Sequence, residues 1–128
     1  MHFDHAGIAT TDADALADLY VDLLELERVH VETMDDLDVL FLDAGNGYME
    51  LLEPRSEDST IGRYLADREG GIHHVAFATD DIEDALDRAR DLGVDLVDEE
   101  PRPGAWGHDV AFCHPGSTGG VLVEFVQH

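Results

Sequence analysis

The sequence contains no lysine, and all seven of its cationic side chains are arginine. They face 30 aspartates and glutamates, which gives the 128 residues a formal net charge of −23. Nucleic-acid binding needs a cluster of basic side chains to contact phosphates. An anionic membrane surface attracts the same residues. The shortage of cations therefore excludes nucleic acids and anionic membranes as partners.

The sequence also has a single cysteine, Cys113, and no long hydrophobic run. One cysteine excludes an intrachain disulfide and a cysteine-rich zinc site. A membrane-spanning helix needs about 18 or more consecutive apolar residues, which are absent. The N-terminus lacks the basic and apolar regions of a signal peptide. We expect a soluble cytoplasmic protein with one domain over residues 1–128.

The acidic residues are spread along the chain and form no single acidic tail. Together with a hydrophobic content of 44%, this pattern indicates a folded domain with an acidic surface rather than a disordered chain. Repulsion within such a surface destabilises the compact state at low salt. At about 1 M salt the Debye length falls to roughly 3 Å and the repulsion is screened. The composition therefore predicts a halophilic protein from a salt-rich cytoplasm.

The hydrophobic pattern divides the chain into two similar halves, each read as strand, helix and three strands. The first half has predicted strands at residues 3–10, 27–33, 37–43 and 47–53, and its helix begins after Asp12. After a polar connection and a short helix at 60–67, the second half has strands at 72–79, 94–97, 108–113 and 120–126. Its helix begins after Asp80 or Asp81. The buried stripes expected on the two helices are Leu16, Leu19, Tyr20, Leu23 and Leu24, and Ile82, Ala85, Leu86, Ala89 and Leu92.

An internal repeat of this size implies two βαβββ modules in one domain. We predict an α+β fold in which the modules form a cupped, partly open mixed β-sheet with the helices outside. Module one covers residues 1–54, the linker and short helix cover 55–70, and module two covers 71–128.

The repeat also aligns individual polar residues within apolar strands. Residues 5–10 align with 74–79, and residues 48–52 with 122–126, which makes His5 equivalent to His74 and Glu50 equivalent to Glu124. Two imidazoles and two carboxylates, with no thiolate, suit a divalent ion such as Co, Mn, Ni, Zn, Fe or Mg. Strand alternation turns the neighbouring His73 to the opposite face, so we expect it to be structural.

Several short segments resemble one known family. Within the vicinal oxygen chelate superfamily, the chain resembles the methylmalonyl-CoA epimerases over residues 3–127. The matching segments are residues 5–9 (HAGIA), 50–54 (ELLEP), 71–77 (GIHHVAF), 103–107 (PGAWG), 111–115 (AFCHP) and 119–124 (GGVLVE).

This resemblance implies an isomerase that epimerises methylmalonyl-CoA at C2 by 1,1-proton transfer, through an enolate that a divalent metal ion stabilises. It implies His5, Glu50, His74 and Glu124 as metal ligands, Glu124 and Glu50 as candidate catalytic residues, an acyl-CoA substrate and a homodimer. Members of the family often have glutamine where Glu50 stands. A second glutamate, proposed as a base in some members, aligns with Val39.

Two other functions remain open on the same scaffold. One is a glyoxalase-like isomerase or lyase that acts on a hemithioacetal, and the other is a metal-free protein that sequesters small molecules. The arginines bear on the substrate, because an acyl-CoA carries phosphates that an acidic protein repels unless cations are placed locally. We expect most of them to form surface ion pairs: Arg55, Arg63, Arg68 and Arg102.

Overall fold

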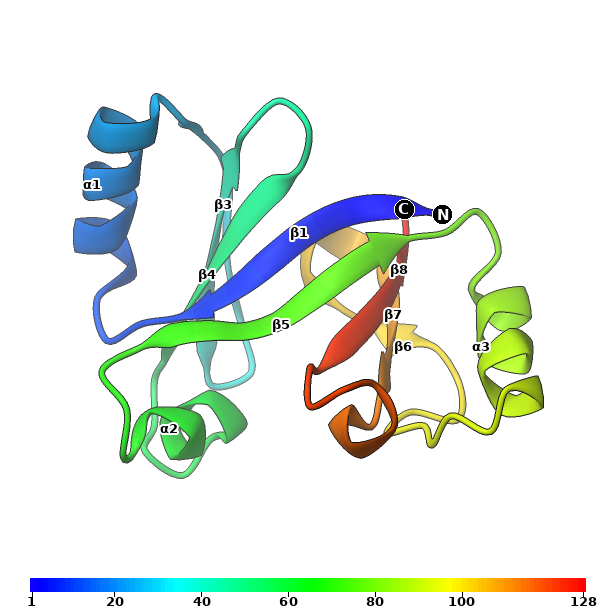
Figure 1. Cartoon of the computed structure of the whole chain (residues 1–128). Coiled ribbons are helices and arrows are strands. Elements are labelled where there is room, and N and C mark those ends of the chain that lie inside the picture. The colour runs from blue at the N-terminus through cyan, green and yellow to red at the C-terminus, as the bar shows by residue number, and fades with distance from the viewer. The chain divides into compact units, whose positions relative to one another are not determined.

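The structure is a computed structural model that describes all 128 residues (Figure 1). Three α-helices and eight strands follow the predicted order, with two short 3₁₀ turns in the second half. The elements are β1 (His2–Ala9), α1 (Ala13–Leu24), β2 (Glu27–Met34), β3 (Leu37–Asp43), β4 (Tyr48–Pro54), α2 (Thr60–Leu65), β5 (Gly71–Ala78), α3 (Ile82–Asp91), β6 (Arg102–Pro103), η1 (Ala105–Gly107), β7 (Asp109–Cys113), η2 (Pro115–Ser117) and β8 (Val123–Gln127).

The strands form one mixed sheet in the order β2-β3-β4-β1-β5-β8-β7-β6. Strand β1 pairs with β4, and β5 with β8, in parallel, whereas β2–β3, β3–β4, β6–β7 and β7–β8 are antiparallel. Each half thus has the same connectivity, β1-α1-β2-β3-β4 and β5-α3-β6-β7-β8. The predicted α+β class, the mixed sheet and the two βαβββ modules are confirmed.

The chain divides into two compact units. The N-terminal unit is His5–His73, and the C-terminal unit combines Met1–Asp4 with His74–His128. The start of β1 therefore belongs to the C-terminal unit, where the Phe3 ring meets Phe77 edge-on at 6.0 Å. Both chain ends lie in this unit close together (Figure 1), and His128 Nε2 lies 2.6 Å from Asp4 Oδ1.

In the N-terminal unit, helix α1 packs on one face of β3 and β4 (Figure 1). Two carboxylates fix its start. Asp12 Oδ1 accepts the Ala15 N–H at 3.1 Å, and Glu53 Oε1 accepts the Ala13 N–H at 2.8 Å. These bonds satisfy helix N–H groups that have no partner within the helix. The helix and strands enclose a core of Ile8, Ala13, Ala17, Leu40, Leu42 and Leu51.

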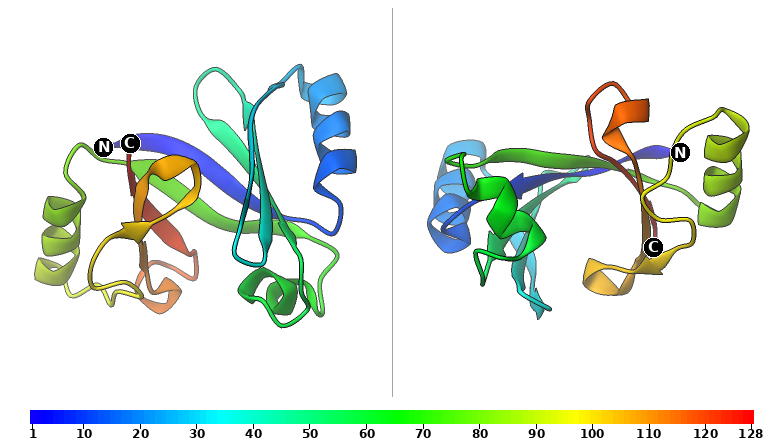
Figure 2. Two further views of the ribbon diagram at one scale, coloured as in Figure 1. Left: turned by 180° about the vertical axis from the view of Figure 1, so that it is seen from behind. Right: turned by 90° about the horizontal axis from the view of Figure 1, so that it is seen from below.

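In the C-terminal unit, helix α3 packs in the equivalent way on β7 and β8 (Figure 2). Ile82 and Leu86 contact Ala111 in its core. Asp81 is the N-cap, which settles the alternative with Asp80. Gln127 Oε1 accepts the Ile82 N–H at 2.8 Å, as Glu53 does for α1. The repeat therefore extends to the side chain that anchors each helix to its sheet.

One predicted strand is wrong. Residues 94–97 form no strand, and only Leu96 makes a single bridge to Cys113. The fourth strand of the second half is β6, where Arg102 pairs with Val110. Both segments can adopt an extended conformation, and strand formation depends on which one finds a partner along β7. Local propensity does not contain that information.

The predicted helix stripes are only partly correct. Leu16 and Tyr20 pack against the core, but Leu19 and Leu23 are 54% and 65% exposed. Leu24 and Leu92, the C-cap residue of α3, are also exposed. Helix α1 has apolar residues around most of its circumference, so a 3.6-residue period cannot select one face. The small side chains of Ala13 and Ala17 make the closest approach to the sheet. Neither these helices nor α2 is long and apolar enough to cross a membrane.

Candidate metal centre

The first predicted His–Glu pair forms within the N-terminal unit. His5 lies on β1 and Glu50 on the parallel neighbour β4, where Glu50 is in register with Gly7. His5 Nε2 lies 3.4 Å from Glu50 Oε1, and both side chains are buried. A buried carboxylate is costly unless a partner compensates its charge. The buried His5–Glu50 pair therefore indicates a candidate functional site, because packing alone does not favour a buried carboxylate.

The second pair forms within the C-terminal unit with the same geometry. His74 lies on β5 and Glu124 on the parallel neighbour β8, in register with Ala76. His74 Nε2 lies 3.0 Å from Glu124 Oε1, and both side chains are buried. In both units the glutamate thus lies opposite the residue two positions after the histidine. The equivalence predicted from the repeat is confirmed for each pair.

Each histidine also contacts a phenylalanine that the sequence analysis did not single out. The Phe41 ring meets His5 edge-on at 5.7 Å, and the Phe112 ring meets His74 edge-on at 5.5 Å, both at an interplanar angle of 84°. Phe41 pairs with Glu50 across β3 and β4, and Phe112 pairs with Glu124 across β7 and β8. Strand alternation could have found both rings, since each shares a face with its glutamate.

A third His–Glu pair was also missed. On β2, His30 Nε2 lies 2.8 Å from Glu32 Oε1, and both side chains are about a quarter exposed. His30 pairs with Phe41 across the strands and lies 6.1 Å from its ring, and Glu32 pairs with Val39. Val39 is itself buried and apolar. The signal was the alternation of β2, which places His30 and Glu32 on one face and the exposed Val29 and Val31 on the other.

The neighbouring His73 has a different environment from His74. Its ring meets Tyr64 edge-on at 5.0 Å. Strand alternation separates the two histidines onto opposite faces of β5, as the sequence analysis expected. Among the predicted ligands, His5, His74 and Glu124 are three buried nitrogen and oxygen donors of the kind that hold a metal ion. This donor set fits the nitrogen- and oxygen-ligated divalent ions named above.

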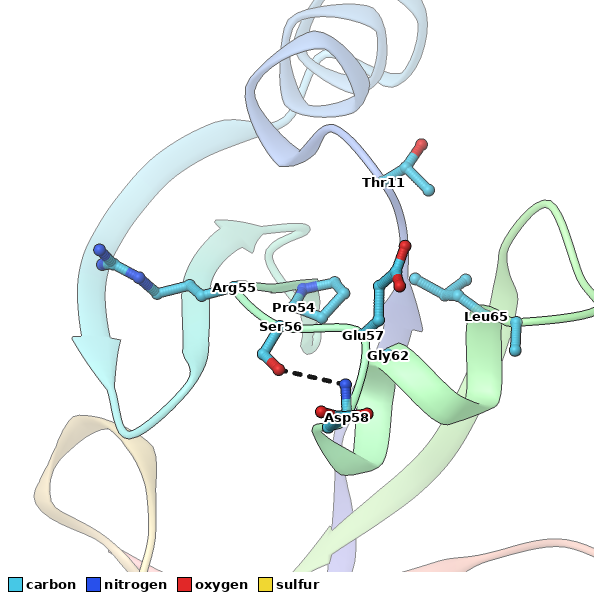
Figure 3. Close-up of a pocket in the computed structure, with 9 residues that line it drawn as sticks. Thr11, Pro54, Arg55, Ser56, Glu57, Asp58, Gly62 and Leu65 are labelled. Atoms are coloured by element: carbon cyan, nitrogen blue, oxygen red, sulfur yellow. Dashed lines mark hydrogen bonds between the residues drawn. The ribbon is translucent and has the colours of Figure 1, made fainter.

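A separate pocket of about 670 Å³ lies in the N-terminal unit beside α2 (Figure 3). In it Ser56 Oγ accepts the Asp58 N–H at 3.1 Å, and the Arg55 side chain points away from Glu57 (Figure 3). The pocket contains no histidine and neither of the paired glutamates, so it is distinct from the predicted ligand set. Its lining consists of Thr11, Pro54, Arg55, Ser56, Glu57, Asp58, Gly62, Leu65 and Ala66.

Comparisons with known proteins give a consistent result. The sequence pattern of the Glyoxalase/Bleomycin resistance protein/Dioxygenase superfamily matches residues 4–112. YqjC of Bacillus subtilis is 36% identical over 126 residues, which cover 97% of this chain and 90% of YqjC. The ethylmalonyl-CoA/methylmalonyl-CoA epimerase of Cereibacter sphaeroides is 36% identical over 128 residues, which cover 97% of this chain and 96% of the epimerase.

A solved structure extends the similarity to the fold. A methylmalonyl-CoA epimerase in complex with methylmalonyl-CoA and NH4+ superposes with a TM-score of 0.91 at 37% identity. The match covers 98% of this chain and 93% of that one. The similarity is thus full-length in both sequence and structure. The chain belongs to the Glyoxalase/Bleomycin resistance protein/Dioxygenase superfamily and, within it, is similar to the methylmalonyl-CoA epimerases.

Proposed function

We propose that the protein epimerises methylmalonyl-CoA at C2 by 1,1-proton transfer and depends on a divalent metal ion. The observation that carries the proposal is the pair of buried His–Glu contacts at repeat-equivalent positions, His5–Glu50 and His74–Glu124. The epimerases of similar length and fold support the choice of substrate. The reaction needs no nucleophile and no organic cofactor, which agrees with a donor set of imidazoles and carboxylates.

The proposed ligands are His5, Glu50, His74 and Glu124, three of which belong to the candidate donor group. When bound, the ion supplies a Lewis acid that polarises the thioester carbonyl of the substrate. The protein keeps the donors buried, which excludes water and strengthens electrostatic interactions at the reacting centre. The edge-on contacts of Phe41 and Phe112 limit the rotation of the two imidazoles and so maintain their orientation.

Proton transfer between the two faces of a planar C2 needs a proton-accepting group on each face. We assign these roles to the carboxylates of Glu50 and Glu124. One glutamate, as the carboxylate, would accept the C2 proton, while the other, starting as the carboxylic acid, would donate its proton to the opposite face. Each turnover would thus leave the protonation states of the two residues exchanged, ready for the reverse reaction. Val39, which aligns with a glutamate proposed as a base in some family members, shares its strand face with Phe41 but cannot exchange a proton. We therefore assign the proton transfers to Glu50 and Glu124.

Deuterium exchange at C2 of methylmalonyl-CoA in D₂O tests the proposal. We expect exchange and epimerisation in the metal-loaded protein, their loss on chelation, and their return when a divalent ion is added. His74→Ala should abolish both activities, and the neighbouring variant His73→Ala is the matched control that should keep them. Metal analysis of the same samples should show a bound ion in the control and little or none in His74→Ala.

Other outcomes would replace the proposal. A metal-loaded protein that leaves the C2 proton in place but converts a hemithioacetal would be a glyoxalase-like isomerase or lyase. A protein that holds no divalent ion, and whose His74→Ala variant keeps its affinity for a small molecule, would be a sequestering protein. Both results contradict epimerisation.

We also propose that the protein works as a homodimer in a salt-rich cytoplasm. The net charge of −23 and the absence of lysine support the salt-rich environment. Strand β2, at one edge of the sheet, exposes Val29 and Val31, which suits contact with a second copy. Light scattering of the purified protein at high and low KCl tests the dimer. A monomer at every salt concentration would contradict the dimer.

A further inference from the structure

We infer that Arg102 binds the phosphate groups of the acyl-CoA substrate and thereby sets its orientation. This inference rests on the proposed function and adds a substrate-binding residue to it. A protein of charge −23 repels a polyphosphate ligand, so affinity requires a cation at the place where the phosphates lie. Among the seven arginines, Arg102 alone lies over a ring that contacts one of the paired histidines.

Strand register places Arg102 on the same face as the His74–Glu124 pair. Arg102 is opposite Val110 across β6 and β7, and Phe112 is opposite Glu124 across β7 and β8. Val110 and Phe112 alternate on one face of β7, whereas Ala111 packs toward α3 on the other. The views in Figures 1 and 2 agree that α3 covers that second face. Arg102 therefore lies on the histidine-bearing side of its unit, opposite the side that α3 covers.

The contacts of Arg102 hold it in place without using its terminal nitrogens. The guanidinium carbon lies 5.4 Å from the centroid of the Phe112 ring, whose edge contacts His74. Arg102 Nε donates to Asp98 Oδ1 at 3.1 Å, and the Asp98 side chain is mostly buried. The ion pair thus occupies one edge of the guanidinium, and Nη1 and Nη2 stay available. A guanidinium edge of this kind matches the geometry of phosphate oxygens.

The equivalent position in the other unit differs. By strand register, Arg102 opposite Val110 corresponds to Glu32 opposite Val39 in the N-terminal unit, where Glu32 pairs with His30 and His30 lies 6.1 Å from the Phe41 ring. A carboxylate thus stands in one unit at the position that the guanidinium takes in the other. The His–Glu–Phe arrangement repeats in both units, but the permanently charged guanidinium occurs in only one. A substrate with a small acyl group at one end and phosphates at the other is therefore bound in one direction, with its phosphates toward β6.

Arg102→Gln tests the inference, and Arg88→Gln is its matched control. Both arginines lie in the C-terminal unit, pair with an aspartate four residues earlier at 3.1 Å and lose the same charge. Only Arg102 faces the histidine side. We expect Arg102→Gln to raise the KM for methylmalonyl-CoA roughly 10- to 100-fold, the value of charge-assisted hydrogen bonds, with the loss appearing in KM rather than kcat. Arg88→Gln should stay within about twofold.

Methylmalonyl-pantetheine, which has the acyl group but no phosphates, separates phosphate binding from other effects. Arg102→Gln should change its KM little. An equal loss for both substrates would overturn the inference, because it would mean that Arg102 acts on the acyl group or on folding. Arg102→Lys, which keeps the charge but loses the paired donors, should fall between wild type and Arg102→Gln for methylmalonyl-CoA.

Calorimetry with free coenzyme A and the chelated protein gives a readout that does not depend on turnover. Weaker binding by Arg102→Gln than by wild type and Arg88→Gln supports the inference even if the protein proves not to be an epimerase. Equal binding by all three proteins contradicts it even if epimerisation is confirmed. Unfolding curves of the variants check that each is folded at the assay temperature.

Discussion

The buried pair His74–Glu124 should lower the stability of the metal-free fold, and replacement of both residues tests this. Their side chains are only 5% and 6% exposed, and the atoms in contact are 3.0 Å apart. Within its own unit the pair is flanked by the apolar residues Ala76, Val126 and Phe112. Desolvation of such a pair offsets most of its Coulomb attraction. Replacement of buried ion pairs by apolar residues of similar volume is often neutral or stabilising, by about 1–4 kcal/mol.

We therefore expect His74→Leu combined with Glu124→Leu to match or exceed the wild-type unfolding free energy in chelator, by up to about 4 kcal/mol. Glu124→Leu alone should cost about 1–3 kcal/mol, because it leaves the buried His74 imidazole without this partner. The double variant should thus be more stable than that single variant.

Urea unfolding in concentrated KCl measures these free energies, with and without a divalent ion. Wild type should gain about 2.7 kcal/mol when the free ion is at 100 times its dissociation constant, and the double variant should gain almost nothing. Glu100→Leu, at an exposed glutamate, is the control that should keep the gain. A double variant less stable in chelator than Glu124→Leu would refute the reasoning, since the pair would then be stabilising the fold.

The other predictions concern the core, the linker, the cysteine and the charge. Leu42→Ala should lower the unfolding free energy by about 2–5 kcal/mol because Leu42 is fully buried. Leu92→Ala, at an exposed position, should change it by less than about 0.5 kcal/mol. Equal effects of the two variants in urea unfolding would contradict the described core. Gly62→Ala should destabilise by at least about 1 kcal/mol, since the added Cβ would lie 2.2 Å from the Ser56 carbonyl oxygen, and an unchanged melting temperature would argue against that close approach. Burial raises the pKa of the Cys113 thiol. The neutral thiol therefore contributes to the unfolding free energy in full below the pKa of the unfolded state, and this contribution is lost as pH rises through the pKa of the folded state. A disulfide reagent should label Cys113 only as fast as the protein opens. The unfolding midpoint should rise with KCl until the charge is screened, and full stability in low salt would contradict the inferred self-repulsion.

The two His–Glu pairs could be predicted because two independent signals coincide there. The repeat aligned His5 with His74 and Glu50 with Glu124, and strand alternation gave the face of each residue. Both signals are local to a strand or to a pair of repeats. The structure confirms both pairs at contact distance. The helix start at Asp12, and that of α3 to within the choice between Asp80 and Asp81, were predictable because an N-cap acts on N–H groups only a few residues away.

The features that the sequence could not predict are those that depend on which segments pair and pack in three dimensions. Residues 94–97 and 102–103 both suit an extended strand, and only the pairing of Arg102 with Val110 decides between them. Arg102 lies outside every strand that the sequence predicts, so the sequence indicates for it only a surface ion pair. The position of Arg102 over the Phe112 ring follows from the pairing of Arg102 with Val110. The face of the sheet on which Arg102 lies could therefore not be predicted without that pairing.

The combination of repeated and unrepeated parts has a chemical rationale. The proposed epimerisation would treat the two faces of one carbon almost equally, and a duplicated His–Glu–Phe arrangement would supply two nearly equal sets of groups. The rest of an acyl-CoA has no such symmetry, so the residues that bind it need not repeat. The two units differ in this respect, because one has the Arg102–Asp98 pair and the other has the His30–Glu32 pair. The proposed substrate also differs between its acyl end and its phosphate end. If this division holds, substitutions within the two pairs should change kcat and metal binding, whereas those at Arg102 should change which substrates bind.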